Sequence, residues 1–307
     1  MTSIRIGTRG SQLALWQANE LARQLAAVGV QTEIVTIKTT GDRRQNVPLA
    51  SIGGKGLFIK ELEEALDAGE VDVAVHSLKD VPSIIPEQFA LAAFLERADP
   101  RDAWVRLDGK ALADLPEGAV VGTSSPRRQA QVLAQAPHLR VEMIRGNVET
   151  RIGKHRRGEY DGVILAAAGL TRLGRIADAT SLFSVDQMVP AAGQGIVAIE
   201  ILRDRDALRN RIRRINHAPS ETAALVERGV LQKFGTRLDC YSPIAVHATV
   251  NDGSIEARAF VSDLHGAGAI HVHETGSDRD ALVETVFARL TARGANEILA
   301  RRVDRET

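Results

Sequence analysis

Short runs of β-branched residues alternate with helical patterns through about the first 200 residues of the chain. The strand-like runs cover residues 4–7, 33–38, 71–76, 89–95 and 103–107, and the first helical patterns cover residues 13–28 and 57–68. Gly29 and Gly69 follow these two helical patterns, and glycine is the commonest residue just beyond a helix end. The alternation predicts α/β layers in which helices cover a largely parallel sheet.

The α/β pattern starts again after Asp99-Pro100. The opening Ile6-Gly7-Thr8-Arg9-Gly10-Ser11 resembles Val121-Gly122-Thr123-Ser124-Ser125-Pro126, and each precedes a helical pattern. Each opening places small and hydroxyl residues between a strand and a helix, where open α/β sheets bind anionic ligands. We therefore expect two similar α/β lobes.

The pattern changes at about Pro219 to a helix, three strand-like runs and a second helix. These elements cover residues 221–234, 244–250, 255–261, 269–273 and 280–290. The change predicts a separate small α+β domain at the C-terminal end. Turn-rich segments at residues 97–101 and 190–195 are candidate hinges.

The charge composition bears on the class of partner. The 307 residues include 39 basic and 39 acidic side chains, so the formal net charge is zero. Binding to a nucleic-acid backbone needs an excess of cations, so we expect no nucleic-acid partner. Of the basic residues, 32 are arginine and 7 are lysine. The planar arginine fork suits carboxylates and phosphates, although the base composition of the genome also explains this ratio.

A single cysteine, Cys240, excludes an intramolecular disulfide framework and a multi-cysteine metal site. A lone cysteine is more often a buried small hydrophobe than a nucleophile, although the loop position of Cys240 strengthens the case for a nucleophile. The first residues have no export signal, and no run of about 18 apolar residues follows. We expect a cytoplasmic protein that does not span a membrane.

Residues 122–129 are the most informative segment. Ser125 suits the N-cap of a helix and Pro126 its first position, and Arg127 and Arg128 follow in the first turn. Two cations there oppose the helix dipole and cost a few tenths to about 1 kcal/mol unless an anion joins them. An anion site and solvated arginines are both open at this point. Residues 121–160 carry eight Lys or Arg against three acidic residues, so this lobe is locally basic.

Residues 141–151 predict a strand, a Gly-Asn turn and the start of a helix. Arg145 is expected to end the strand at the same rim as Arg127, and Arg151 to lie near the first helical turn. A surface helix carrying Glu149 and Arg151 is the structural alternative. The convergence with Arg127 favours a binding role.

In the first lobe, the glycine-rich residues 52–58 lack the spacing of a nucleotide-binding loop. Lys79 and Asp80 follow the strand at 71–76. An aspartate in such a place is usually a helix cap or an ion-pair member, and otherwise handles protons. The chain shows no Ser-His-Asp order and no HExxH motif, so neither a triad hydrolase nor a metal site is expected.

Taken together, these segments resemble the porphobilinogen deaminase family, also called hydroxymethylbilane synthases, over nearly the whole chain. The matching blocks, in family order, are residues 6–11, 13–18, 53–58, 74–82, 122–125, 127–129, 145–147 and 193–195. No single block is specific, whereas the ordered series is.

The resemblance implies an α/β fold with two lobes like those of periplasmic binding proteins and a small C-terminal α+β domain. It places the first lobe at residues 1–97 and 196–216, the second at 98–195 and the C-terminal domain at 217–307. It also implies a dipyrromethane cofactor joined through a thioether to Cys240. In this family four porphobilinogen units lose ammonia, join head to tail on the cofactor and leave as hydroxymethylbilane after hydrolysis. We expect porphobilinogen as the substrate, a monomer, and no membrane or obligate protein partner.

The chemistry of that reaction explains the residue types. Loss of ammonia from the aminomethyl group leaves a cationic azafulvene, which a carboxylate at the pyrrole nitrogen stabilises while it moves protons. By resemblance, Asp80 is this carboxylate. Every ring carries an acetate and a propionate, which require matching cationic forks. By the same resemblance, cofactor and substrate are bound by Arg9, Ser11, Lys79, Thr123, Ser124, Ser125, Arg127, Arg128, Arg145, Asn147, Arg151, Arg172 and Gln194, and a lid carries Lys55 and Phe58.

The chain departs from the family pattern at two places. Gly-Gly usually precedes the attachment cysteine, whereas Leu238-Asp239 precedes Cys240 here. Bacterial relatives often carry a lysine four residues before Lys55, where this chain has Ser51.

Two other classes of protein compete with the transferase. In a non-catalytic anion-binding protein, Asp80 and the loop cysteine Cys240 would have no function. Nucleic-acid binding through residues 121–160 is disfavoured by the formal net charge of zero.

Overall fold

The computed structural model describes residues 3–38, 59–238 and 241–301. The chain divides into two compact units, one formed by Met1–Ala98 with Gly195–Ala224 and the other by Asp99–Gln194 with Leu225–Thr307. The chain therefore leaves the first unit after Ala98 and returns to it at Gly195. The three-domain boundaries expected from the sequence stay predictions.

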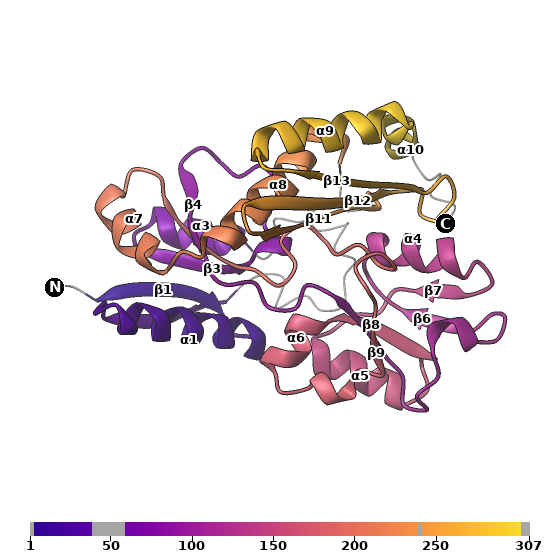
Figure 1. The fold of residues 1–307 in the computed structure, drawn as a ribbon. Coiled ribbons are helices and arrows are strands. Elements are labelled where there is room, and N and C mark those ends of the chain that lie inside the picture. The colour runs from indigo at the N-terminus through magenta and orange to yellow at the C-terminus, as the bar shows by residue number, and fades with distance from the viewer. Residues whose placement is uncertain (1–2, 39–58, 239–240, 302–307) are drawn as a thin grey trace. The chain divides into compact units, whose positions relative to one another are not determined.

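The first unit is built around a five-stranded sheet in the order β2-β1-β3-β10-β4. Strands β1, β3 and β4 of this sheet are labelled in Figure 1. Its strands are β1 (Ile4–Arg9), β2 (Thr32–Ile37), β3 (Val73–Ser77), β4 (Phe89–Phe94) and β10 (Val197–Leu202). Its helices are α1 (Gln12–Ala27), α3 (Lys60–Asp67), the short η3 (Leu78–Asp80), α7 (Asp206–Ile212), η6 (Arg213–Ile215) and the start of α8 (Ala218–Phe234).

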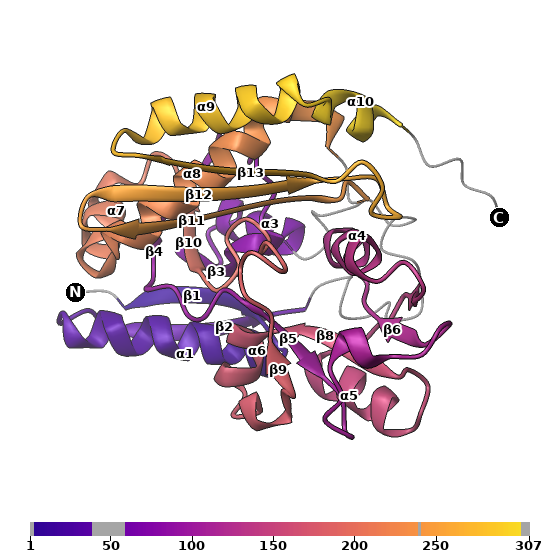
Figure 2. The same ribbon diagram turned by 45° about the vertical axis from the view of Figure 1, so that its right-hand side comes forward.

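Helices α1 and α3 cover opposite faces of this sheet (Figure 2). The buried residues of α1 include Ala14, Ala18, Leu21 and Leu25, which recur every three or four positions and so share one face of the helix. They pack on Ile4, Ile6 and other apolar residues of the sheet. On the other face, Leu62, Ala65 and Leu66 of α3 pack against the sheet.

The second unit contains a second five-stranded sheet, in the order β7-β6-β8-β5-β9. Its strands are β5 (Asp102–Val105), β6 (Val120–Gly122), β7 (Arg140–Glu142), β8 (Gly162–Ala166) and β9 (Ser181–Leu182). Its helices are η4 (Leu112–Asp114), α4 (Pro126–Gln135), α5 (Val148–Arg156), α6 (Ala167–Arg172) and η5 (Ile176–Asp178). Val132 of α4 packs on one face of the sheet with Trp104, and Ile152 of α5 packs on the other face with Val163.

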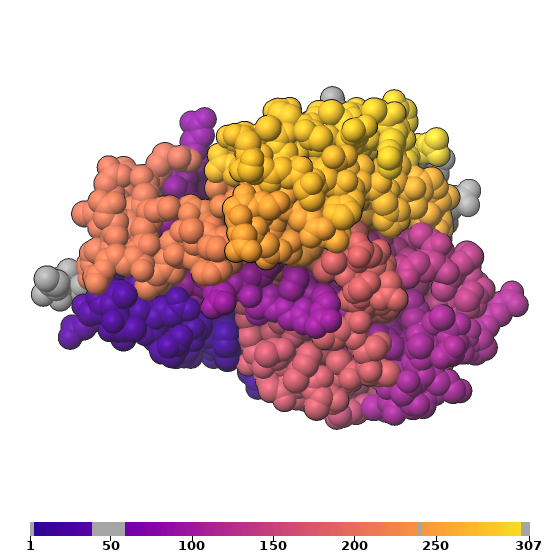
Figure 3. Space-filling model, in the orientation of Figure 1, coloured from indigo at the N-terminus to yellow at the C-terminus, as the bar shows by residue number. Residues whose placement is uncertain are grey.

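The C-terminal part of the second unit is an antiparallel sheet with helices on one face. Its elements are η7 (Gly235–Arg237), β11 (Ile244–Asn251), β12 (Ser254–Val261), β13 (Ile270–Gly276), α9 (Arg279–Ala292) and α10 (Ala295–Ala300). The outer side of α9 is at the surface (Figure 3). The other face of the sheet contributes Phe260, which packs with Ala130 of α4, Val189 and Ala245.

The predicted α/β fold with two similar lobes and a small C-terminal α+β domain is confirmed. In each large sheet a strand that lies second from the edge, β1 in the first sheet and β6 in the second, is followed by a helix with a serine N-cap. The expectation of parallel strands needs one correction, since β10 runs antiparallel to β3 and β5 antiparallel to β8. Each of these strands follows a segment in which the chain passes from one unit to the other, and it begins beside the carboxyl end of its neighbour, β3 for β10 and β8 for β5. It therefore has to run in the opposite direction to that neighbour.

Within the described residues, no helix combines the length and the apolar composition that a membrane crossing requires.

Candidate active site

The predicted site residues of the first unit lie at one edge of its sheet. Strands β1 and β3 are parallel neighbours, so their carboxyl ends meet. Arg9 ends β1, and the hydroxyl of Ser11 accepts a hydrogen bond of 3.3 Å from the backbone N–H of Ala14 to cap α1. Lys79 and Asp80 form the second and third residues of η3, directly after β3, and Asp80 is exposed.

The predicted site residues of the second unit follow the carboxyl ends of its three parallel strands, β6, β7 and β8. Thr123, Ser124 and Ser125 link β6 to α4, and the Ser125 hydroxyl caps α4 by accepting a hydrogen bond of 3.4 Å from Arg128 N–H. The segment after β7 carries Arg145, Asn147 and Arg151, and Arg172 ends the helix after β8.

The turn after β7 differs from the expectation in one detail. Strand β7 ends at Glu142, so Arg145 lies in the turn that follows and does not end the strand. Asn147 caps α5 by accepting a hydrogen bond of 2.9 Å from Thr150 N–H. Arg151 folds back on this turn, because its Nε donates to the carbonyl of Gly146 at 2.8 Å.

Arg127 and Arg128 are buried and share one internal carboxylate, Asp102, the first residue of β5. The Nη1 atom of Arg127 and the Nη2 atom of Arg128 each lie 2.7 Å from an Asp102 oxygen. The exposed fractions of these three side chains are 6%, 7% and 0%. The alternative of solvated arginines is therefore wrong, and an internal anion meets the two cations at the start of α4.

One carboxylate does not balance two guanidinium groups, so this cluster carries one positive charge in excess. Asp102 is the acidic partner of both arginines within the described residues. The Nε atom of Arg127 is buried and has no hydrogen-bond partner there. A buried cationic donor without a partner is costly, so the cluster is suited to one further anion.

The pKa values in the cluster follow from burial and charge. Burial alone would raise the pKa of Asp102, but the charges of Arg127 and Arg128 and the hydrogen bonds to its oxygens hold this pKa well below its ordinary value. Burial lowers the pKa of Arg127, against the effect of Asp102. The two arginines therefore favour the ionised form of Asp102.

Gln194 joins the same cluster from the segment that leads back to the first unit. Its side-chain Nε2 donates to Asp102 Oδ1 at 2.9 Å and to the carbonyl of Pro100 at 2.7 Å. The neighbouring Gly193 N–H donates to the buried carboxylate of Glu227 in α8 at 2.6 Å. The predicted site residues Arg127, Arg128 and Gln194 thus meet at Asp102.

Sequence reasoning missed Asp102. Its signal was an acidic residue directly before the apolar run Ala103-Trp104-Val105, at a position that the structure buries completely. A lone carboxylate at such a place needs a cationic partner. The identity of that partner depends on pairing between β5 and β8, which no local pattern reveals.

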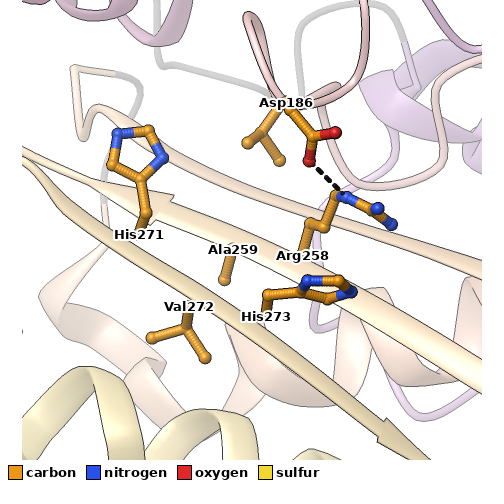
Figure 4. Close-up of a pocket in the computed structure, with 7 residues that line it drawn as sticks. Asp186, Arg258, Ala259, His271, Val272 and His273 are labelled. Atoms are coloured by element: carbon orange, nitrogen blue, oxygen red, sulfur yellow. Dashed lines mark hydrogen bonds and ion pairs between the residues drawn. The ribbon is translucent and has the colours of Figure 1, made fainter.

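A separate polar pocket lies on the C-terminal sheet (Figure 4). It is lined by Asp186, Val189, Arg258, Ala259, His271, Val272 and His273. Arg258 is paired with Asp186 at 2.7 Å and with Glu256 at 2.9 Å. The pocket contains none of the predicted site residues, and its arginine is already neutralised, so it is not the anion site.

Comparison with known proteins decides the family. Residues 4–210 match the family model described as "Porphobilinogen deaminase, dipyromethane cofactor binding domain". A porphobilinogen deaminase of Geobacter sulfurreducens is 44% identical over 310 residues, which cover 100% of this chain and 96% of the relative. The chain belongs to the porphobilinogen deaminase family.

A second relative matches over a similar extent. A porphobilinogen deaminase of Trichlorobacter lovleyi is 45% identical over 96% of this chain and 95% of its own length. Among solved structures, the methionine-binding protein MetQ aligns with a TM-score of 0.43 and 12% identity, over 69% of this chain and 89% of that chain. The predicted family, enzyme class and dipyrromethane cofactor are confirmed, and the chain is a transferase of tetrapyrrole synthesis.

Three residues that the family resemblance assigns, Lys55, Phe58 and Cys240, lie outside the described residues. The nearest described residue after Cys240 is Tyr241, which lies four positions before Ala245. An extended chain spans about 3.5 Å per residue, so Tyr241 lies within about 14 Å of Ala245. Ala245 belongs to the same buried apolar cluster as Ala130 of α4, which lies three residues after Arg127.

Proposed function

We propose that Asp80 is the catalytic carboxylate of this chain and that cations at the rims of the two sheets hold the carboxylates of the growing tetrapyrrole. The cations are Arg9, Lys79, Arg127, Arg128, Arg145, Arg151 and Arg172. The hydrogen-bonding residues are Ser11, Thr123, Ser124, Ser125, Asn147 and Gln194. Cys240 is the attachment point of the dipyrromethane, and Lys55 and Phe58 belong to a lid.

The observation that carries the proposal is the buried cluster of Arg127, Arg128 and Asp102. It has one positive charge in excess and one buried guanidinium N–H without a partner among the described residues. A ligand carboxylate supplies both the missing charge and the missing acceptor. The acetate and propionate groups of a dipyrromethane are such carboxylates, so the residues present fit this cofactor.

The residues of the chain then have distinct tasks. When bound, the dipyrromethane supplies the pyrrole ring to which the first porphobilinogen unit is joined. Asp80 accepts a hydrogen bond from the pyrrole N–H of porphobilinogen. As ammonia leaves, this carboxylate stabilises the positive charge that develops on the ring, and it then moves the ring protons. Arg9 and Lys79 bind carboxylates beside it on the same sheet edge.

We also propose that the enzyme works in the cytoplasm as a monomer without a nucleic-acid or membrane partner. The formal net charge of zero argues against a nucleic-acid partner, and a single cysteine fits a reducing compartment.

The decisive experiment compares Asp80→Asn with Asp114→Asn. Both residues are exposed and end a three-residue 3₁₀ helix, η3 for Asp80 and η4 for Asp114, so the two substitutions make matched changes. Ammonia release from porphobilinogen should fall at least about 100-fold in Asp80→Asn, because a positioned acid or base contributes about that much. Asp114→Asn should stay within about twofold of the unsubstituted enzyme.

Intact mass spectrometry accompanies the kinetics. Each chain should be heavier by one dipyrrole, and the added mass should disappear in Cys240→Ser. Normal turnover in Asp80→Asn removes Asp80 from its role, and an unmodified but active enzyme contradicts attachment at Cys240. Reversible ligand binding without ammonia release would support a non-catalytic anion-binding protein.

A further inference from the structure

Asp102 occupies a position where an isolated carboxylate is costly. It begins β5, pairs with Ala166 of β8 and is completely buried, and the next three residues of β5 are buried and apolar. Loss of its solvation has to be offset by the groups around it. The contacts that Asp102 makes therefore show what it does.

The two oxygens of Asp102 are occupied unequally. Oδ2 accepts a hydrogen bond from Nη1 of Arg127 at 2.7 Å. Oδ1 accepts from Nε and Nη2 of Arg128 at 3.0 and 2.7 Å and from Nε2 of Gln194 at 2.9 Å. One carboxylate thus contacts three of the residues proposed to bind the ligand.

The donors of Arg127 show what this arrangement leaves for the ligand. The two hydrogens of Nη1 are directed to Asp102 and to the carbonyl of Val189, each at 2.7 Å. Nε is buried without a partner among the described residues. A guanidinium group binds a carboxylate in bidentate fashion along an edge, and the edge that contains Nε also contains Nη2. Asp102 and the carbonyl of Val189 occupy both hydrogens of Nη1. The edge formed by Nε and Nη2 is therefore the one that remains for a ligand carboxylate.

We propose that Asp102 is a positioning residue that fixes which edge of Arg127 meets the ligand and limits the cluster to one ligand carboxylate. With Asp102 in place the cluster has one positive charge in excess, which a single carboxylate cancels. Without its charge the excess is two, and Nη1 of Arg127 loses its charged acceptor and keeps only the carbonyl of Val189, so the guanidinium group is held less firmly. The proposal rests on the proposed function of the arginines and assigns to Asp102 a role that acts through them.

The test compares Asp102→Asn and Asp102→Glu with Asp178→Asn. Asp178 is a matched control, because it also bridges two arginines of the same unit, Arg156 at 3.1 Å and Arg175 at 2.5 Å, neither of which belongs to the proposed site. The folded, monodisperse fraction of each variant is isolated. The readout is the share of these folded chains that carries the dipyrrole mass, and it does not depend on turnover.

In Asp102→Asn, the share of loaded chains should fall at least about tenfold, since loss of one partner of a buried charge pair weakens binding by that much or more. Asp102→Glu, which keeps the charge but displaces it by one methylene group, should load to an intermediate extent. Asp178→Asn should load like the unsubstituted chain. In Asp102→Ala, added formate should restore loading, because formate can occupy the volume of the missing carboxylate.

Equal loading of the Asp102 variants and the unsubstituted chain would overturn the assignment. Failure of all three Asp102 variants to fold, with or without formate, would also overturn it, since Asp102 would then act on the fold and not on the ligand. An unsubstituted chain without any dipyrrole would instead contradict the proposed function, so the two failures are distinguishable.

Discussion

Substitution of Gly195 by alanine tests how closely the segment that leaves the first unit at Ala98 packs against the segment that returns to it at Gly195. Gly195 is the residue at which the chain returns to the first unit, and it has a φ of +88°. Its carbonyl accepts a hydrogen bond of 3.1 Å from the N–H of Ala98, the last residue before the chain leaves. A Cβ atom at position 195 would lie 2.5 Å from the carbonyl oxygen of Ala98.

The size of the effect follows from two contributions. An alanine at positive φ costs about 1–2 kcal/mol, because its Cβ crowds the backbone. The contact at 2.5 Å cannot be kept, so the backbone of residue 98 has to move and its hydrogen bond to Gly195 weakens. Overpacking of this kind costs about 1–3 kcal/mol more. We expect a total loss of about 2–5 kcal/mol.

Gly29 provides the matched control, since it lies in the same unit at a φ of +76° and a Cβ there meets nothing within 4 Å. Gly29→Ala should therefore cost only the conformational part, about 1–2 kcal/mol. Urea unfolding followed by circular dichroism gives both losses, and hydrogen exchange of peptides from the first unit shows where stability is lost. Equal losses for the two variants, within about 0.5 kcal/mol, would refute the steric argument.

Two further substitutions test the electrostatics. Burial and the charge of Glu200 raise the pKa of Glu63 from its ordinary value of 4.5 to about 7, so the folded chain keeps a proton that the unfolded chain has lost. Stability should fall as the pH rises from about 4.5 to about 7, and Glu63→Gln should remove about 1 kcal/mol of this dependence after allowance for solvent screening. Urea unfolding at several pH values checks this, and parallel profiles for both proteins would show that Glu63 does not titrate in this range. Arg127→Leu should abolish dipyrrole loading in intact mass spectra, whereas Arg156→Leu, at an exposed surface pair, should load normally; loading of both would count against a carboxylate site at Arg127.

Much of the fold followed from local patterns. The serine cap of α4 could be predicted because capping depends on residues within one turn of each other. The α/β alternation and the repeated openings at residues 6–11 and 121–126 likewise reflect short-range hydrophobic periodicity. The position of Asp80 after β3 was also accessible, since a strand end and a following turn are neighbours in the sequence.

The family could be identified from the order of the motif blocks alone. That order carried the expectation of a dipyrromethane cofactor, a role for Asp80 and a set of arginines. It could not separate arginines that face a ligand from arginines that face the protein, because both types have the same sequence context.

Only the tertiary structure decided the partners of Arg127 and Arg128. Asp102 is 25 and 26 residues away from them, and Gln194 is 92 residues from Asp102, so the cluster depends on how β5 pairs with β8 and where the returning segment passes. The antiparallel direction of β5 and β10 was equally hidden, because strand direction depends on where the chain enters a sheet. Local composition determined the elements and the kind of chemistry, whereas the balance of charge in the buried cluster required contacts between residues far apart in the chain.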